Sequence, residues 1–336
     1  MAFSPSDKTK TRNDFNGMEP VPAPEKKFIL VHFSDLHIVC IDQIKKRDFI
    51  NKRLLGYLRW KLHREAEHRN EILAILQKDL QRAKPDHIAI TGDLTHLGLP
   101  SEFKKVRRWL QSLGATTQVT VVPGNHDTYV RTDWNQTFDC WLDYMVSDTQ
   151  YQKRGSANGF DDLFPTLRVR GQIALIGVCT ARPNIPYLAI GSIGAVQLKK
   201  LETILKQTAE QRLFRIISIH HPPISGIVSW RRRLTDAPAL RKLLARYGTE
   251  LLLHGHTHKT ALNTLKIPAG LTLVMGAPSA SSLGRTYERR ARYYIYKIFR
   301  YGDGWNVNIA ERVYSPNDYS FISGVEQRFY VPAMAG

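Results

Sequence analysis

The sequence contains little cysteine and no long apolar run. Its three cysteines, Cys40, Cys140 and Cys179, are too few and too scattered for a disulfide framework or a zinc ribbon, so a reducing compartment is expected. No stretch approaches the roughly 18 apolar residues of a membrane span, and the N-terminal segment lacks the apolar core of a signal peptide. Internal repeats and low-complexity tracts are also absent. These features predict a cytoplasmic protein with a disordered polar tail over residues 1–27 and a single domain over residues 28–330.

Acidic residues are scarce as well. The chain has 30 Asp and Glu against 48 Lys and Arg, which gives a net charge of +18. Such a charge predicts an anionic partner, namely nucleic acid, an acidic membrane surface or a phosphate-bearing substrate. A basic character that serves only solubility is the alternative. The sequence contains no recognised nucleic-acid-binding module, and nothing in its basic and aromatic pattern demands one.

Much of the positive charge lies in residues 45–69. This stretch has nine Lys or Arg against three acids, interleaved with large apolar residues such as Leu54, Leu58 and Trp60. The pattern predicts a basic amphipathic insertion. It can act as a lid or as a peripheral contact with the inner face of a membrane, or it can pack on the domain with its basic face in water.

Five short polar blocks follow five apolar, strand-like runs of the sequence. The runs cover residues 28–33, 87–91, 118–122, 214–219 and 250–253. The blocks are Asp35-Leu-His37, Gly92-Asp93, Gly124-Asn-His-Asp127, His220-His-Pro-Pro223 and Gly255-His-Thr-His258. Each block alone is a weak signal, because Gly-Asp is commonly a turn and a histidine at a strand end is usually only hydrogen-bonded. Together they place polar groups at five strand ends, where burial without partners would cost several kcal/mol or more.

The blocks supply two carboxylates, an amide and four imidazoles as candidate ligands. Neutral imidazole and carboxylate suit Mn, Fe, Zn, Ni or Co, whereas the thiolates that select soft metals are absent from the blocks. Seven such ligands can hold two divalent metal ions if one carboxylate bridges them. Two cations roughly 3.5–4 Å apart can clamp both oxygens of a phosphoryl displacement, so an anionic phosphoester is the expected substrate.

The order of the blocks resembles that of the calcineurin-like metallophosphoesterase superfamily over residues 35–258. The resemblance implies an α/β fold in which helices flank a two-sheet β-sandwich, the four-layer metallophosphoesterase fold. It also implies two metal ligand sets that share Asp93 as the bridge. The first set is Asp35, His37, Asp93 and His258, and the second is Asp93, Asn125, His220 and His256. In this pattern the ligand stands two residues before the first proline, which selects His220 over His221. His221 is then either a substrate contact or a structural histidine on the other side of the strand end.

His126 and Asp127 are the predicted catalytic residues. His126 has no metal role in this scheme, and its place beside Asn125 suits a general acid that protonates the leaving oxygen, with Asp127 holding the imidazole tautomer. The attacking group would be a metal-bound hydroxide. His96 and His254 flank ligands, and we expect them to support the site rather than to catalyse. The predicted enzyme is thus a binuclear metallophosphoesterase that hydrolyses a phosphodiester or pyrophosphate bond.

Three functions remain open at this point. The blocks are similar to those of the class III cyclic-nucleotide phosphodiesterase group, which favours a phosphodiesterase. The basic stretch favours a UDP-2,3-diacylglucosamine pyrophosphatase of lipid A synthesis, an enzyme type of the same superfamily. A catalytically silent binding protein with the same fold is the third, although every expected ligand is present.

The remaining pattern is typical of alternating helices and strands. Helical spacing of apolar residues predicts helices over 69–83, 101–113, 198–205 and 238–247. Residues 261–330 are rich in β-forming residues, and we expect them to be strands that complete the second sheet.

Overall fold

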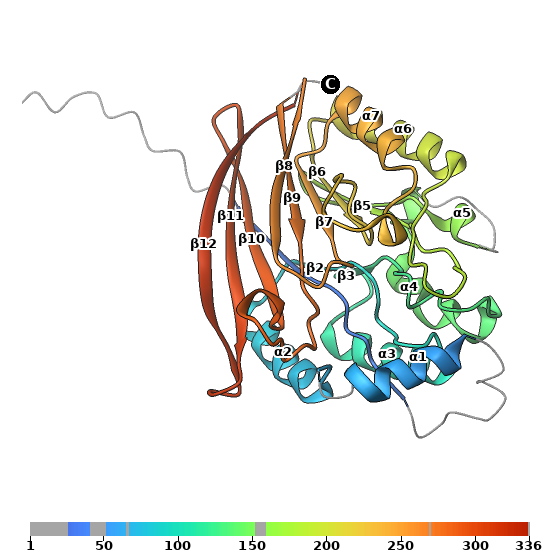
Figure 1. Ribbon diagram of the computed structural model, residues 1–336. Coiled ribbons are helices and arrows are strands. Elements are labelled where there is room, and N and C mark those ends of the chain that lie inside the picture. Colours follow the sequence, from blue (N-terminus) through green and yellow to red (C-terminus); the bar gives the residue numbers. More distant parts are fainter. Residues whose placement is uncertain (1–25, 41–51, 65–66, 152–158, 269, 335–336) are drawn as a thin grey trace, which may run out of the picture.

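Two six-stranded mixed sheets form the centre of the computed structural model (Figure 1), which describes residues 26–40, 52–64, 67–151, 159–268 and 270–334. The first sheet has the order β12-β11-β10-β1-β2-β3, and the second has the order β4-β5-β6-β7-β9-β8. The strands of the first sheet are β1 (Phe28–Phe33), β2 (His87–Ile90), β3 (Val119–Val121), β10 (Arg292–Tyr301), β11 (Gly304–Ser315) and β12 (Ser320–Pro332). Those of the second are β4 (Thr166–Arg170), β5 (Ile173–Val178), β6 (Phe214–Ile219), β7 (Leu251–His254), β8 (Ala261–Ile267) and β9 (Gly270–Gly276).

Helices cover the outer face of each sheet. Helices α2 (Asn70–Ala83), α3 (Pro100–Leu113), α4 (Leu142–Met145) and α5 (Phe160–Leu163) contribute to the apolar layer on the first sheet, and α6 (Ala195–Glu210) and α7 (Ala237–Tyr247) to that on the second. Helix α1 (Arg53–Arg59) continues as a π-helix at Trp60–Arg64. Figure 1 shows α2 and α3 on one side of the sandwich and α6 and α7 on the other. This is the predicted four-layer arrangement, and the predicted fold class is confirmed.

The alternation of side chains along the strands accounts for three apolar layers. In β1, Leu30 packs between the two sheets, whereas Val31 and Phe33 pack under α2 and α3. In β5, Leu175 faces the space between the sheets and Ile176 faces α6 and α7. Successive residues of a strand point to opposite faces, so a strand that is buried on both faces is mainly apolar along its whole length. The continuous apolar runs in the sequence reflect this double burial.

The central strands of both sheets run parallel and end at the same edge. β1 pairs in parallel with β2, and β2 with β3, while β5, β6, β7 and β9 form a parallel set in the second sheet. The carboxyl ends of β1, β2, β3, β6 and β7 therefore meet where the two sheets adjoin, and the five polar blocks follow those ends.

The prediction for residues 261–330 was only half right. β8 and β9 extend the second sheet, but β10, β11 and β12 extend the first, because β10 pairs antiparallel with β1. Strand propensity indicates that a segment is extended but not which edge it will pair with, and this choice depends on long-range packing. The assignment of residues 28–330 to a single domain stays a prediction, and residues 1–25 of the expected tail lie outside the described residues.

Candidate metal centre

The four predicted ligands of the first metal lie together. Their ligand atoms, one from each of Asp35, His37, Asp93 and His258, all lie within 4.8 Å of one another. Nε2 of His258 lies 3.0 Å from Oδ1 of Asp35 and 3.1 Å from Nε2 of His37. Two imidazole nitrogens and a carboxylate oxygen thus converge on one point, and this is a donor arrangement that suits a divalent cation.

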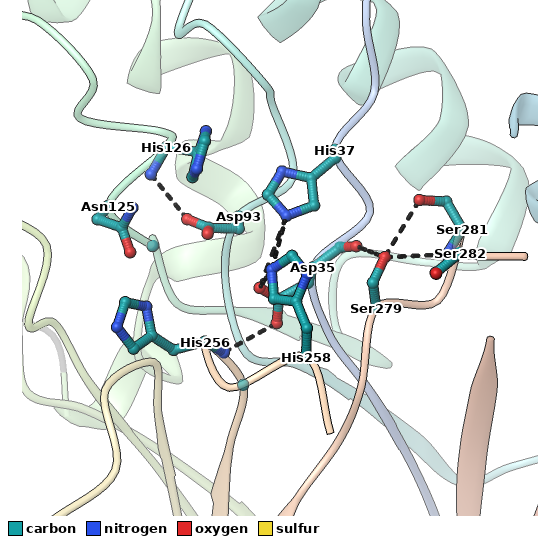
Figure 2. Close-up of polar contacts among 12 residues, drawn as sticks. Asp35, His37, Asp93, Asn125, His126, His256, His258, Ser279, Ser281 and Ser282 are labelled. Atoms are coloured by element: carbon teal, nitrogen blue, oxygen red, sulfur yellow. Dashed lines mark hydrogen bonds and ion pairs between the residues drawn. The ribbon is translucent and has the colours of Figure 1, made fainter. Parts of the chain in front are cut away.

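The second predicted set converges on the other side of Asp93. Nε2 of His220 lies 3.2 Å from Oδ1 of Asn125 and 3.4 Å from Oδ2 of Asp93. The ring of His256 lies 5.1 Å from that of His220, centroid to centroid. Figure 2 shows Asp93 between Asn125 on one side and the cluster of Asp35, His37 and His258 on the other.

Backbone carbonyls orient two of these imidazoles. Nδ1 of His220 lies 2.7 Å from the carbonyl oxygen of Thr91, and Nε2 of His256 lies 2.9 Å from that of Arg232. A carbonyl oxygen only accepts, so these nitrogens carry the protons. The unprotonated nitrogens are then Nε2 of His220 and Nδ1 of His256. Such outer hydrogen bonds fix the tautomer of metal-ligating histidines.

Burial and neighbouring charges shift the pKa values of the ligands in two directions. Burial, followed by the nearby imidazoles of His68 and His126, lowers the pKa of His37 well below its usual range, which favours the neutral ring that binds metal. Burial raises the pKa of Asp35, but His258 and His220 together outweigh it and the net pKa is lowered, which favours the carboxylate. For His220, burial lowers the pKa while the Asp93 carboxylate raises it, with a net pKa of about 9, which favours the protonated ring. A cation bound to Asp93 would remove this stabilisation of the proton on His220.

The backbone at the site is strained. Nine non-glycine residues have positive φ in the part of the chain that the structure describes, and five of them are predicted ligands: Asp35, His37, Asp93, His256 and His258. A left-handed conformation costs a non-glycine residue about 1–3 kcal/mol and persists where the surroundings enforce it. The concentration of these left-handed residues in the ligand blocks indicates a functional site.

Glycine permits the close approach of two of the blocks. Gly92 has φ +98°, a conformation that L side chains rarely adopt. Gly124 is needed for a different reason, since a β-carbon there would collide with the backbone nitrogen and the carboxylate of Asp93. Gly92 thus permits a turn with positive φ, whereas Gly124 supplies the space that Asp93 occupies.

His126 lies at the edge of the cluster. Its backbone N–H donates a 2.7 Å hydrogen bond to Oδ1 of Asp93, and its ring lies 4.7 Å from that of His37. Its Nδ1 lies 2.6 Å from the carbonyl oxygen of His96. That carbonyl, and not Asp127 as the sequence suggested, is the hydrogen-bond partner that sets the tautomer of His126.

Asp127 instead braces the loop. Its Oδ1 accepts from the backbone N–H and hydroxyl of Thr95, and its Oδ2 accepts from the backbone N–H of Gly124. Burial, reinforced by the Asp93 carboxylate, raises the pKa of Asp127 to about 7 despite these hydrogen bonds. The carboxylate ties together the loops that follow β2 and β3.

The histidines left open by the sequence have structural partners. His221 is buried, with Nδ1 2.7 Å from Oγ1 of Thr180 and Nε2 3.2 Å from the carbonyl oxygen of Ala189. His254 is also buried, with Nδ1 3.0 Å from the carbonyl oxygen of Gly255. These contacts favour the structural interpretation of His221.

A pocket of about 210 Å³ opens over the cluster. Asp93, Asn125, His126, His256 and His258 line its inner part. Its rim carries two cationic side chains, Lys52 and Arg232, and the aromatic side chains of Trp60, Tyr129 and Tyr187. Lys52 and Trp60 belong to the basic stretch over 45–69 for which the sequence left open a role as a lid, whereas Tyr129, Tyr187 and Arg232 were not predicted, because isolated aromatic and basic residues carry no spacing pattern.

The fold is that of the metallophosphoesterases, and the donors present suit two divalent metal ions of undetermined identity. The chain belongs to the calcineurin-like phosphoesterase family, whose model matches residues 28–260. It is 27% identical over 240 residues to a cAMP/cGMP dual specificity phosphodiesterase of Mycobacterium tuberculosis, a match that covers 70% of this chain and 63% of the relative. It is 26% identical over 194 residues to a 3',5'-cyclic-nucleotide phosphodiesterase of Nostoc, a match that covers 56% of this chain and 62% of the relative. The chain thus spans less than two thirds of the length of either relative.

Two solved structures share the fold. A dimetal phosphatase from Danio rerio superposes with a TM-score of 0.54 at 12% identity, and the match covers 93% of this chain and all of the other. A purple acid phosphatase from yellow lupin gives a TM-score of 0.56 at 13% identity, and the match covers 92% of this chain and 55% of the other.

Among the described residues, none of the helices combines the length and apolarity that a membrane span requires.

Proposed function

We propose that this chain hydrolyses phosphodiester bonds with two divalent metal ions, which Asp93 bridges. The position of the Asp93 carboxylate is the observation that carries the proposal. It belongs to the group formed with Asp35, His37 and His258, and its Oδ2 also lies 3.4 Å from Nε2 of His220. One carboxylate thus faces both donor sets, as a bridge must.

The metal ions, when bound, would activate water and offset the charge of the phosphoryl group. The chain itself supplies the proton for the leaving oxygen. Since the carbonyl oxygen of His96 accepts from Nδ1 of His126, the nitrogen that can give and recover a proton at the pocket is Nε2. The hydrogen bond from the His126 backbone to Asp93 holds this imidazole at a fixed distance from the bridge.

The pocket rim fits a phosphodiester with a flat organic group. Lys52 and Arg232 offer positive charge to a phosphate, and the Tyr187 ring at the pocket is 83% exposed. Aromatic faces bind flat bases by stacking, and guanidinium or ammonium groups attract phosphate oxygens. The names of the Mycobacterium and Nostoc relatives point to the same class, the cyclic nucleotides.

A substrate panel tests this proposal. The metal-reconstituted full chain would be assayed with a chromogenic phosphodiester, with cyclic AMP and with UDP-2,3-diacylglucosamine in detergent, alongside His126→Ala. We expect turnover of the first two, strongly reduced in the variant. A protein that binds two metals but hydrolyses none of the three would instead be the silent binding protein that shares the fold.

A second candidate, hydrolysis of a lipid-linked pyrophosphate, has one specific observation in its favour. Helix α1 and the π-helix after it present Leu54, Leu55, Leu58 and Leu62 to solvent, with Leu62 73% exposed. Gly56 and Trp60 of the same segment line the pocket. The predicted basic insertion is therefore helical over 53–64 and combines a pocket-lining side with exposed apolar side chains, whereas residues 45–51 and 65–66 lie outside the described residues. An apolar helix face with basic neighbours is suited to a lipid interface.

Leu58→Gln together with Leu62→Gln separates the two candidates. If α1 contacts a lipid substrate or an acidic membrane surface, Leu58 and Leu62 become buried in lipid, and each contributes about 1.5–3 kcal/mol to binding. The double variant should then lose tenfold or more in kcat/KM for UDP-2,3-diacylglucosamine. It should keep its turnover of the soluble chromogenic diester. Equal kcat/KM for the lipid nucleotide in variant and wild type would remove this candidate.

A further inference from the structure

His68 lies next to the first metal's ligands although it belongs to no predicted block. One ligand nitrogen from each of His37, His68 and His258 lies within 4.8 Å of the other two. The ring centroid of His68 is 4.7 Å from that of His37 and 5.9 Å from that of His258, and those two are 5.0 Å apart.

These separations match imidazoles on a common cation. With metal–nitrogen bonds of about 2.1 Å, two ring centroids on one metal are about 4.6 Å apart in a right-angled arrangement and about 6.4 Å apart in a linear one. All three observed separations fall within this interval. The His68 ring is thus placed to share the cation of His37 and His258.

A network of serines holds Nδ1 of His68. The hydroxyl of Ser279 donates to the carbonyl oxygen of Asp35 at 2.6 Å, so Ser279 has no second proton to give and can only accept from Nδ1 of His68, which lies 3.3 Å away. Nδ1 of His68 also lies 3.0 Å from Ser281 Oγ, whose own proton can go to His68 or to Ser279 Oγ at 3.3 Å. Nδ1 is thus occupied by the serines, which leaves Nε2 as the nitrogen available to a cation. Figure 2 shows the serines beside Asp35.

Donation from Nδ1 of His68 to Ser279 has one consequence for the neutral ring. With the proton on Nδ1, the lone pair of His68 is on Nε2. Ser279 also donates to the carbonyl oxygen of Asp35, so the orientation of His68 and that of the first ligand are coupled.

We propose that Nε2 of His68 is an additional ligand of the metal ion held by Asp35, His37, Asp93 and His258. His68 forms a bridge with Ser282, and the N–H of Arg69 donates to the carbonyl oxygen of Ser281. These contacts attach the C-terminal end of the 45–69 stretch, which also carries α1, to the metal centre. The inference rests on the proposed dimetal centre.

The test measures metal binding. His68→Asn keeps a polar atom at the Nδ1 position and removes Nε2. Co²⁺ would be titrated into the full chain, with calorimetry and visible absorption as readouts. We expect wild type to bind two ions, and His68→Asn to bind one of them at least tenfold more weakly, with a changed absorption spectrum. His68→Glu, whose longer side chain carries a carboxylate to the position of Nε2, should recover most of the affinity.

His87→Gln is the matched control, since it alters a buried histidine of β2 whose Nε2 contacts Thr120. It should bind both ions as wild type does. If His68→Asn binds both ions with unchanged affinity and an unchanged spectrum, His68 is not a ligand and the inference is wrong. If wild type itself binds fewer than two ions, the proposed dimetal centre fails instead. Thermal unfolding of each variant in chelator identifies any that do not fold, and His68→Glu then provides the comparison.

Discussion

The backbone N–H of His126 donates a hydrogen bond to Oδ1 of Asp93 at 2.7 Å, which ties the candidate general acid to the carboxylate that faces both metal sites. The two residues follow β3 and β2, whose parallel pairing brings the loops together. Metal binding and proton transfer are therefore adjacent but assigned to different side chains, and substitutions should separate them.

His126→Ala should keep both metals and lose turnover. Positioned general acids contribute about 10²–10⁴-fold, and the loss should be greatest for leaving groups of high pKa, which need the proton most. The measurement is kcat for an alkyl and a nitrophenyl diester, with bound metal determined on the same samples. Equal losses for the two leaving groups would argue against the assignment of His126 as the acid.

Asp127→Asn should lower the stability of the fold, and it should reduce turnover less than His126→Ala does. The Asp127 carboxylate accepts hydrogen bonds from Thr95 and Gly124, and an amide can replace only part of this set because its nitrogen cannot accept. We expect a loss of about 1–3 kcal/mol in the free energy of unfolding and a smaller fall in kcat than His126→Ala produces. Denaturant unfolding and kinetics on the two variants provide the comparison. An unchanged stability with a loss of turnover as large as that of His126→Ala would restore a direct catalytic role for Asp127.

Gly124→Ala should impair metal binding because its β-carbon would meet the carboxylate and backbone nitrogen of Asp93. We expect both metals to bind at least tenfold more weakly, since Asp93 faces both sets, and calorimetric titration would show it. The matched control is Gly159→Ala, where a β-carbon meets nothing within 4 Å and φ is 175°, an extended value. Equal metal affinities in the two variants would show that the loop adjusts without moving Asp93.

Buried histidines should make the fold sensitive to acid. Burial, and then the charges of Arg168 and Arg170, lower the pKa of His87 well below the unfolded value of 6.5. The folded state therefore favours the neutral ring, so the stabilising contribution is complete above pH 6.5 and is lost as the pH falls below it. In chelator, His87→Gln should reduce the slope of unfolding free energy against pH below 6.5 by up to about 1.4 kcal/mol per pH unit. Parallel slopes for variant and wild type would contradict the lowered pKa.

Much of the site could be predicted from the sequence because its ligands stand in short blocks directly after buried strands. The apolar runs of β1 and β6 are continuous since both faces are buried, and parallel strands deliver their carboxyl ends to one edge. Pairing of β10 with β1 could not be predicted, because it joins residues more than 250 positions apart.

His68 also escaped prediction. It is a single histidine in a basic stretch, without a neighbouring ligand residue or a strand end to mark it, and its place depends on the bridge to Ser282. The partner of the His126 imidazole was missed for a related reason. The partner is the backbone carbonyl of His96, and the type of a residue in the sequence gives no information on where its backbone carbonyl oxygen points.

The most direct test of the dimetal centre is turnover of a chromogenic phosphodiester as a function of metal bound per chain. The full chain, stripped with chelator, would receive Mn²⁺ in known equivalents, with Asp93→Ala treated in parallel. We predict that wild-type activity rises until two ions are bound and that Asp93→Ala stays inactive and binds metal weakly. Full activity at one equivalent, or activity in Asp93→Ala equal to wild type, would contradict the account.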